Sequence, residues 1–109
     1  MTFTKGLPPL DWNDKQLELG AHFLQSHEWS VFQSMVGRKV LHDQTKNWSW
    51  VGFIQQAKLV KFLSLPYGPT VQTDVLACLE SIEDAARSQK LDFIRVEPIG
   101  KVSSVELEA

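Results

Sequence analysis

The sequence predicts one mixed α/β (α+β) domain, in which a single mixed sheet of about four strands is flanked by two to three helices. Two observations lead to this fold class. The 109 residues are 43% hydrophobic and 22% charged, a composition typical of one globular domain. The hydrophobic periodicity and the turn residues then give elements in the order α-α-β-β-β-α-β, with a long helix joining the last two strands.

The first 13 residues are expected to form an extended N-terminal segment, because two consecutive prolines favour an extended backbone. Asp14 can cap a short helix over residues 15–19, and Gly20 can end it. The extended N-terminal segment is therefore expected to precede the first helix.

A second helix is predicted over residues 27–36, with Ser26 as its N-cap. Trp29, Phe32 and Val36 recur at helical spacing, which places them on one face. We expect Trp29 and Phe32 to be largely buried.

Three strands are predicted next, over residues 39–43, 48–56 and 59–65, and short turns between them favour an antiparallel meander. Trp48 and Trp50 lie two residues apart, so they point to the same face of the sheet. Both either pack in a core or interface, or form a stacking platform for a ligand.

The clearest amphipathic helix is predicted over residues 74–89, with Thr73 as its cap, and a strand follows over residues 91–97. A helix of this length is a crossover long enough to make strands 59–65 and 91–97 parallel. The side chains expected to face the sheet are Val75, Leu79, Ile82 and Ala86.

The composition excludes several classes of function. The net charge is −2 and the basic residues are scattered, which disfavours general nucleic-acid binding, although a local basic patch stays open. The one cysteine, Cys78, is read as a packing or surface residue. The sequence shows no metal-ligand spacing and no phosphate-binding loop, and neither a signal peptide nor a membrane span. We therefore expect a cytoplasmic protein without a cofactor.

The loop over residues 66–69 is the best functional candidate on physical grounds. Gly68 lets a backbone approach a ligand closely, and Tyr67 supplies a hydroxyl, although the loop can also be a rigid connector. In the last strand, Arg95 and Glu97 share one face, either as members of structural ion pairs or facing a polar cleft. We expect Tyr67, Gly68 and Arg95 to border one cleft.

Three segments, in this order, resemble the Fem-type (FemABX) peptidoglycan aminoacyltransferases. Residues 23–29, with the sequence FLQSHEW, resemble the motif that opens the family's first long helix. Residues 67–69 resemble its Gly-Pro loop after the third strand, and residues 93–98, FIRVEP, resemble its Arg-x-Glu-Pro strand. The resemblance covers about residues 14–98.

The family carries two acetyltransferase-like (GNAT-like) units and transfers amino acids from charged tRNA to a peptidoglycan precursor. The resemblance implies a partial GNAT-like domain over residues 14–98 and a tail over 99–109, hence an N-terminal fragment or a truncated relative of such an enzyme. It implies peptidoglycan precursor and aminoacyl-tRNA as partners, and no metal or organic cofactor. The substrate-binding residues that it suggests are Trp29, Gln33, Arg38, Tyr67, Gly68, Pro69 and Arg95.

The sequence departs from the family at two places, after the helix tryptophan and before the Gly-Pro loop, where Leu65 and Pro66 stand instead of the arginine that is frequent in the family. Members that bind a precursor pyrophosphate often place a lysine soon after the helix tryptophan, whereas residues 30–33 contain none, and Arg38 can replace it only by turning back toward the cleft. The acyl-CoA loop of true acetyltransferases is also missing, which disfavours a small acetyltransferase. Asp92 and Glu97 are candidates for a catalytic base by residue type alone.

The alternative is a non-catalytic GNAT-like interaction module that binds a partner protein or a second copy of itself. Strand 91–97 would leave unpaired backbone groups along one side of the sheet. We therefore expect self-association through this edge, marginal stability, or C-terminal residues placed along it.

Overall fold

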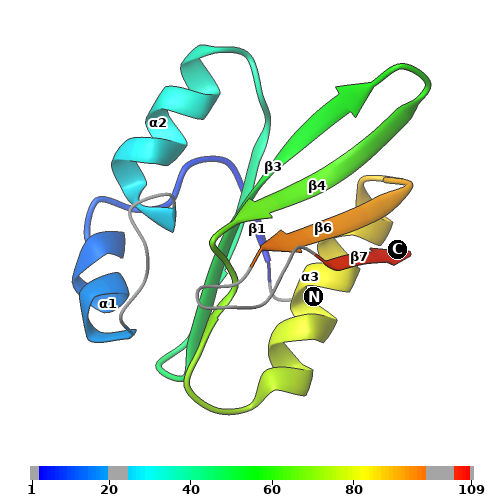
Figure 1. The fold of residues 1–109 in the computed structure, drawn as a ribbon. Coiled ribbons are helices and arrows are strands. Elements are labelled where there is room, and N and C mark those ends of the chain that lie inside the picture. Colours follow the sequence, from blue (N-terminus) through cyan, green and yellow to red (C-terminus); the bar gives the residue numbers. More distant parts are fainter. Residues whose placement is uncertain (1–2, 20–24, 98–104, 109) are drawn as a thin grey trace.

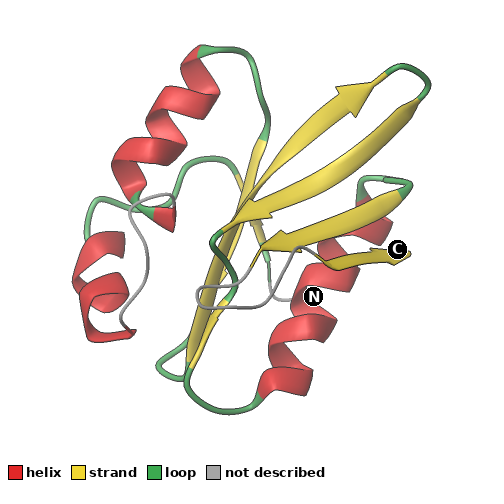
Figure 2. Cartoon of the chain, viewed as in Figure 1, coloured by secondary structure: helices red, strands yellow, loops and turns green. Residues whose placement is uncertain are grey.

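The chain folds into one sheet with helices on both faces in the computed structural model (Figures 1 and 2). The structure describes residues 3–19, 25–97 and 105–108. The helices in these segments are α1 (Trp12–Leu19), α2 (His27–Met35) and α3 (Val75–Ser88). The strands are β1 (Thr4–Lys5), β2 (Val40–Gln44), β3 (Trp48–Ala57), β4 (Val60–Pro66), β5 (Thr70–Val71), β6 (Phe93–Glu97) and β7 (Val105–Glu108).

The seven strands form one mixed sheet in the order β1-β2-β3-β4-β6-β7, and β5 pairs with the first residues of β3. β1 to β4 are antiparallel, whereas β4 and β6 are parallel, with Leu63 opposite Ile94. The mixed sheet and the parallel pair joined by α3 confirm the predicted fold class. The predicted number of about four strands was too low. β1, β5 and β7 have only two to four residues each, too few for a recognisable alternation of hydrophobic and polar residues.

β7 covers the side of β6 that was expected to be an open edge. It pairs antiparallel with β6, from Phe93 opposite Glu108 to Val96 opposite Val105. Of the three outcomes expected for this edge, the structure has the one in which C-terminal residues lie along it. Self-association, which would now have to use another strand, stays a prediction.

The helices divide between the two faces of the sheet (Figure 2). α3 covers one face, where Trp48 and Trp50 are both buried in the larger hydrophobic cluster, so the prediction that they share a face is confirmed. α1 and α2 cover the other face, where Trp12 and Phe53 belong to a second cluster. No helix in the described residues has the length and hydrophobicity that crossing a membrane requires.

α1 begins three residues earlier than predicted. Trp12 is 1% exposed, and its indole Nε1 donates a hydrogen bond of 2.8 Å to the carbonyl of Gln25. This contact holds residues 12–14 in the helix, so the predicted extended segment over residues 1–13 is wrong at its end. Gly20, expected to end the helix, lies outside the described residues.

α2 begins as predicted, because the Ser26 hydroxyl accepts the backbone N–H of Trp29 at 3.1 Å. Its buried face is only partly the one expected, since Trp29 packs against the second cluster but Phe32 is exposed. Ser30 and Gln33 are buried, whereas Phe32 is 49% exposed and Trp29 is half-buried. Ser30 can be buried because its hydroxyl donates to the carbonyl of Ser26.

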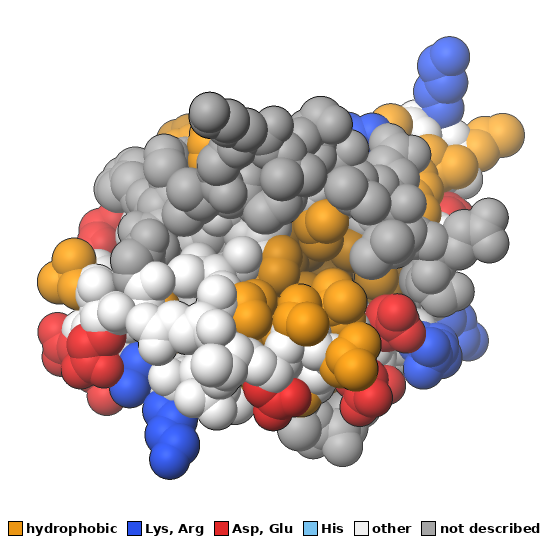
Figure 3. Space-filling model, turned by 60° about the horizontal axis from the view of Figure 1, so that its bottom comes forward, with side chains coloured by type: hydrophobic (Ala, Val, Ile, Leu, Met, Phe, Trp, Pro, Cys, Tyr) orange, Lys and Arg blue, Asp and Glu red, His pale blue; other side chains and the backbone are white. Residues whose placement is uncertain are grey.

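α3 spans the predicted residues to within one at each end, but its first turn is exposed. Asp74 precedes it in the left-handed region without a side-chain cap, and Thr73 is not the cap. Val75 is 52% exposed and Leu79 is half-buried, so the predicted face is only partly correct. Figure 3 brings this end of the molecule forward and shows hydrophobic side chains with acidic ones beside them. The buried residues of α3 are Cys78, Ser81, Ile82, Ala85 and Ala86.

A polar chain explains why α3 turns small residues toward the sheet. The indole Nε1 of Trp50 donates to the Ser81 hydroxyl at 3.0 Å, and that hydroxyl donates to the Asp43 carboxylate at 2.7 Å. Ser81 is thereby paired although it is buried. Its neighbours on this face, Cys78 and Ala85, are small enough to let the helix approach closely.

His42, on β2, is the buried titratable group with a clear consequence for stability. Its ring Nδ1 lies 2.9 Å from the carbonyl of Gly6, and because a carbonyl only accepts, Nδ1 carries the hydrogen. The side chain is 7% exposed, and burial lowers the pKa of His42 below its usual value. The folded state therefore favours the neutral imidazole.

We expect the free energy of unfolding to fall as the pH drops below about 6.5, the usual pKa of histidine. The stability that the neutral His42 contributes is fully present above that pH, and it is lost as the pH falls through the lower pKa of the folded state. The reason is that the unfolded chain then binds a proton that the folded chain excludes. Urea denaturation between neutral and mildly acidic pH measures it, and His42→Gln should flatten the dependence. An identical pH dependence in both proteins would contradict the assignment to His42.

Candidate functional site

The side-chain amide of Gln25 lies between β3 and β4 where these strands separate. Their pairing runs from Ala57 opposite Val60 to Phe53 opposite Ser64, and the same register would place Val51 opposite Pro66. At that position the Gln25 amide, and not the opposite strand, forms hydrogen bonds with the backbone of each strand. Gln25 Oε1 accepts the N–H of Val51 at 2.9 Å, while Nε2 donates to the carbonyls of Val51 at 2.9 Å and Pro66 at 3.0 Å.

The loop of residues 67–69 is built against this amide. A Cβ on Gly68 would lie 2.5 Å from atoms of the Gln25 side chain, so only glycine leaves room for it. The carbonyl of Gly68 also accepts the N–H of Glu97 at 3.2 Å, which ties the loop to the end of β6. The group that approaches Gly68 closely is thus Gln25, which favours the connector reading of this glycine; Tyr67 is 42% exposed and borders solvent.

Arg38 turns back onto α2. Its guanidinium Nη1 donates a hydrogen bond of 2.5 Å to Oε1 of Gln33, and Gln33 is 6% exposed. Trp29 lies one helical turn before Gln33 and packs on the second cluster. Its ring lies against that of Phe32, tilted by 30°, with centroids 5.3 Å apart. Three of the predicted site residues, Trp29, Gln33 and Arg38, therefore belong to one helix and the residues just after it.

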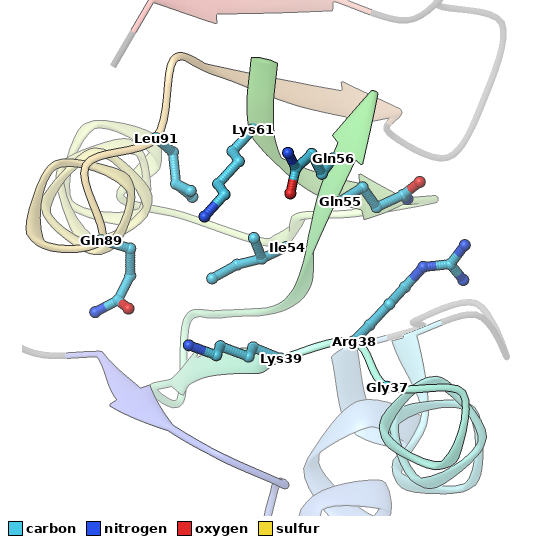
Figure 4. A pocket seen from close by; sticks show the side chains of 9 residues that line it. All are labelled: Gly37, Arg38, Lys39, Ile54, Gln55, Gln56, Lys61, Gln89 and Leu91. Atoms are coloured by element: carbon cyan, nitrogen blue, oxygen red, sulfur yellow. The ribbon is translucent and has the colours of Figure 1, made fainter. Parts of the chain in front are cut away.

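A basic groove with a volume of about 360 Å³ opens at this end of α2 (Figure 4). Lys39, Lys61 and Gln89 point toward the same side of β3, around Ile54, whereas Arg38 points to the other side. A second hollow adjoins it and adds Lys5 to the basic residues. None of the residues that line the basic groove is acidic; they are Gly37, Arg38, Lys39, Ile54, Gln55, Gln56, Lys61, Gln89 and Leu91.

Arg95 lies apart from both groups. Its guanidinium carbon is 5.0 Å from the ring centroid of Phe62 and 5.9 Å from that of Phe93, and these rings stack at 4.8 Å. Both rings precede Arg95 along their strands, so the side chain points back toward the amino ends of β4 and β6. The loop of residues 67–69 comes after the carboxyl end of β4. This geometry therefore gives no support to the expected cleft between the loop and Arg95.

The candidate acid and thiol groups have structural surroundings. The Asp92 carboxylate accepts the backbone N–H of Lys61 at 2.8 Å, which joins β4 to the start of β6. Burial raises the pKa of the Cys78 thiol to about 12, and the Asp43 carboxylate adds to the shift, so the thiol stays protonated at neutral pH. Among the described residues, no three His, Cys, Asp or Glu side chains gather as metal ligands.

Sequence reasoning missed Gln25, Lys39 and Lys61. The partners of Gln25 lie 26 and 41 residues further along the chain, and no local pattern points to them. The adjacent basic pair at residues 38–39 was the available signal for the basic groove, but Lys61 joins it only through the pairing of β3 with β4.

Comparisons with known proteins give no family for this chain. No protein-family model matches it, and no match was found among curated proteins or solved structures. What the chain binds must therefore be inferred from its own residues.

We predict that Gln25→Leu lowers the free energy of unfolding by about 3 kcal/mol or more. The substitution keeps a similar volume but leaves the N–H and carbonyl of Val51 and the carbonyl of Pro66 without their partner, at roughly 1–3 kcal/mol for each buried group. Urea denaturation measures the change. Gln56→Leu, an exposed position on β3, is the matched control and should change stability by less than about 0.5 kcal/mol. Equal stability of the two variants would contradict the role of Gln25.

Proposed function

We propose that this chain forms the acceptor-binding part of an aminoacyltransferase of the kind that the Fem-type enzymes represent. Its ligand would be a phosphorylated peptidoglycan precursor, whose peptide receives amino acids from aminoacyl-tRNA. The observation that carries the proposal is the hydrogen bond from Arg38 to Gln33. This bond holds the Arg38 guanidinium beside residues 30–33. Resembling enzymes that bind a precursor pyrophosphate often have a lysine in this segment, and this chain has none there.

The chemistry of Arg38 suits a diphosphate. A guanidinium has several N–H donors in a rigid plane that matches phosphate oxygens, and the bond to Gln33 uses one of them and orients the rest. Arg38 is exposed, so a ligand can reach it. Lys39 and Lys61, which point to the other side of β3, add positive charge nearby.

The proposal assigns binding and not catalysis to the described residues. The reaction is the attack of an amine on an aminoacyl ester, which needs positioning and removal of a proton. Asp92 is engaged by the backbone of Lys61, which leaves Glu97 as a candidate by residue type alone. We therefore assign no catalytic base.

The second candidate function is a non-catalytic interaction module that binds a partner protein or a second copy. The observation that favours it is the position of β1 and β7 at the two ends of the strand order. Strands at the ends of a sheet offer backbone groups to another chain.

Calorimetric titration with a nucleotide-linked cell-wall peptide tests the first proposal. We expect measurable binding that Arg38→Ala weakens about tenfold, since a hydrogen bond to a charged group is worth roughly 1.5–3 kcal/mol. Lys58→Ala, which removes a cation outside the lining of the basic groove, should leave the dissociation constant unchanged. The same peptide without its diphosphate should bind no better to the native protein than to Arg38→Ala.

Two results would contradict the proposal. One is an absence of binding by the native protein. The other is equal binding by native protein and Arg38→Ala. The interaction module would be favoured if the native protein does not bind the peptide and light scattering shows a dimer that forms as the protein concentration rises.

A further inference from the structure

Two projecting parts of the chain lie at the same end of the molecule. In Figure 1 the end of α2 and the tip of the β3–β4 hairpin both lie at the top, the helix end on the left and the hairpin tip on the right. The residues after α2 and the residues of the hairpin line the same basic groove, so the two parts face each other across it. We call this end the two-pronged surface; it consists of Met35, Val36, Arg38, Lys39, Lys58, Leu59, Val60 and Lys61.

Both prongs expose large hydrophobic side chains. Leu59 at the hairpin tip is 97% exposed, and Met35 at the end of α2 is 80% exposed. Val36, Val60 and the neighbouring Phe32 are also exposed, while α2 buries Ser30 and Gln33 instead. A surface helix normally turns its large hydrophobic residues inward, so the exposed Phe32 and Met35 depart from the usual pattern.

Cations flank the hydrophobic side chains on each prong. Arg38 and Lys39 follow Met35 and Val36 on one, and all four side chains are exposed. On the other prong, Lys58 and Lys61 enclose Leu59 and Val60 in the sequence.

Acidic groups are scarce in these surroundings. The carboxylate of Asp92 accepts the backbone N–H of Lys61, and no acidic residue lines the basic groove. At the opposite end, the exposed Val75 and Leu76 follow Asp74, and Figure 3 shows acidic side chains beside the hydrophobic ones there. The residues of the two-pronged surface include no acidic one, whereas acidic side chains flank the hydrophobic ones at the end that Figure 3 shows.

We propose that the two-pronged surface docks onto a membrane that contains anionic phospholipids. Exposed leucine and methionine side chains can enter the boundary between headgroups and acyl chains, while adjacent lysines and arginines bind lipid phosphates. The charge argues against a second copy, because a symmetric contact through this surface would bring its four cations against the same four. Nucleic acid would use the cations but would give Leu59 and Met35 no role.

Vesicle sedimentation with the intact chain tests the docking. The probes are vesicles of phosphatidylglycerol and phosphatidylcholine in equal amounts, and vesicles of phosphatidylcholine alone. We expect binding to the anionic vesicles that weakens with added salt, and at least tenfold weaker binding to the neutral ones. Lys58→Gln should weaken binding to anionic vesicles about fivefold, the usual contribution of one basic residue near such a surface.

The hydrophobic prongs are tested separately. The double variant Met35→Ser, Leu59→Ser should bind anionic vesicles about tenfold more weakly or worse. Leu76→Ser, which removes a leucine that is 72% exposed at the opposite end, is the matched control and should bind like the native protein. Circular dichroism and thermal melting establish that each variant keeps its fold.

Three results would overturn the inference. The first is that the native chain fails to bind anionic vesicles. The second is equal binding to both kinds of vesicle. The third is a double variant that binds as the native chain does, while Lys58→Gln weakens binding to vesicles and to a short RNA duplex alike. That result would identify a general polyanion site instead of a membrane surface. The proposed binding of a cell-wall precursor at Arg38 is unaffected by any of these outcomes, since the variants leave Arg38 in place.

Discussion

The side-chain amide of Gln25 makes the contact on which the arrangement of this fold depends. It takes the place of a strand partner between Val51 and Pro66, where β3 and β4 separate. Its own backbone carbonyl accepts hydrogen bonds from Trp12 and Gln16 at 2.8 Å each, which fixes α1. One buried residue thus joins the first helix, the start of the second and two central strands. Burying an amide is costly unless its polar atoms form hydrogen bonds. Here both the oxygen and the nitrogen of the Gln25 amide do so.

This contact also determines where the functional groups lie. Gln25 directly precedes the Ser26 cap, so the amide sets the position from which α2 begins. α2 in turn carries Gln33, which binds the guanidinium of Arg38, one of the residues that line the basic groove. The paired part of β3 and β4 extends beyond the last residue of β3 that pairs with β2, and its residues form the other wall of that groove. The candidate binding groups are therefore held by the same helix and strands that the amide connects.

The sequence predicts the elements of this fold better than their faces. The order of helices and longer strands, the Ser26 cap and the parallel pair joined by α3 follow from local patterns, which act over a few residues. The exposure of Phe32 does not, because it depends on hydrogen bonds that allow Ser30 and Gln33 to be buried. The two-residue strands β1 and β5 and the four-residue β7 are too short to show a hydrophobic periodicity. The contacts of Arg95 with aromatic rings on two strands, and those of Gln25, arise only once distant segments meet.

Hydrogen exchange of the Gln25 side-chain amide, followed by nuclear magnetic resonance, examines this arrangement most directly. Both Nε2 hydrogens lie in hydrogen bonds, to Val51 and to Pro66, and the side chain is fully buried. We expect them to exchange about as slowly as the backbone N–H of Val51, because both need the strands to open. Exchange as fast as that of the exposed Gln56 side chain would show that the amide does not join the two strands.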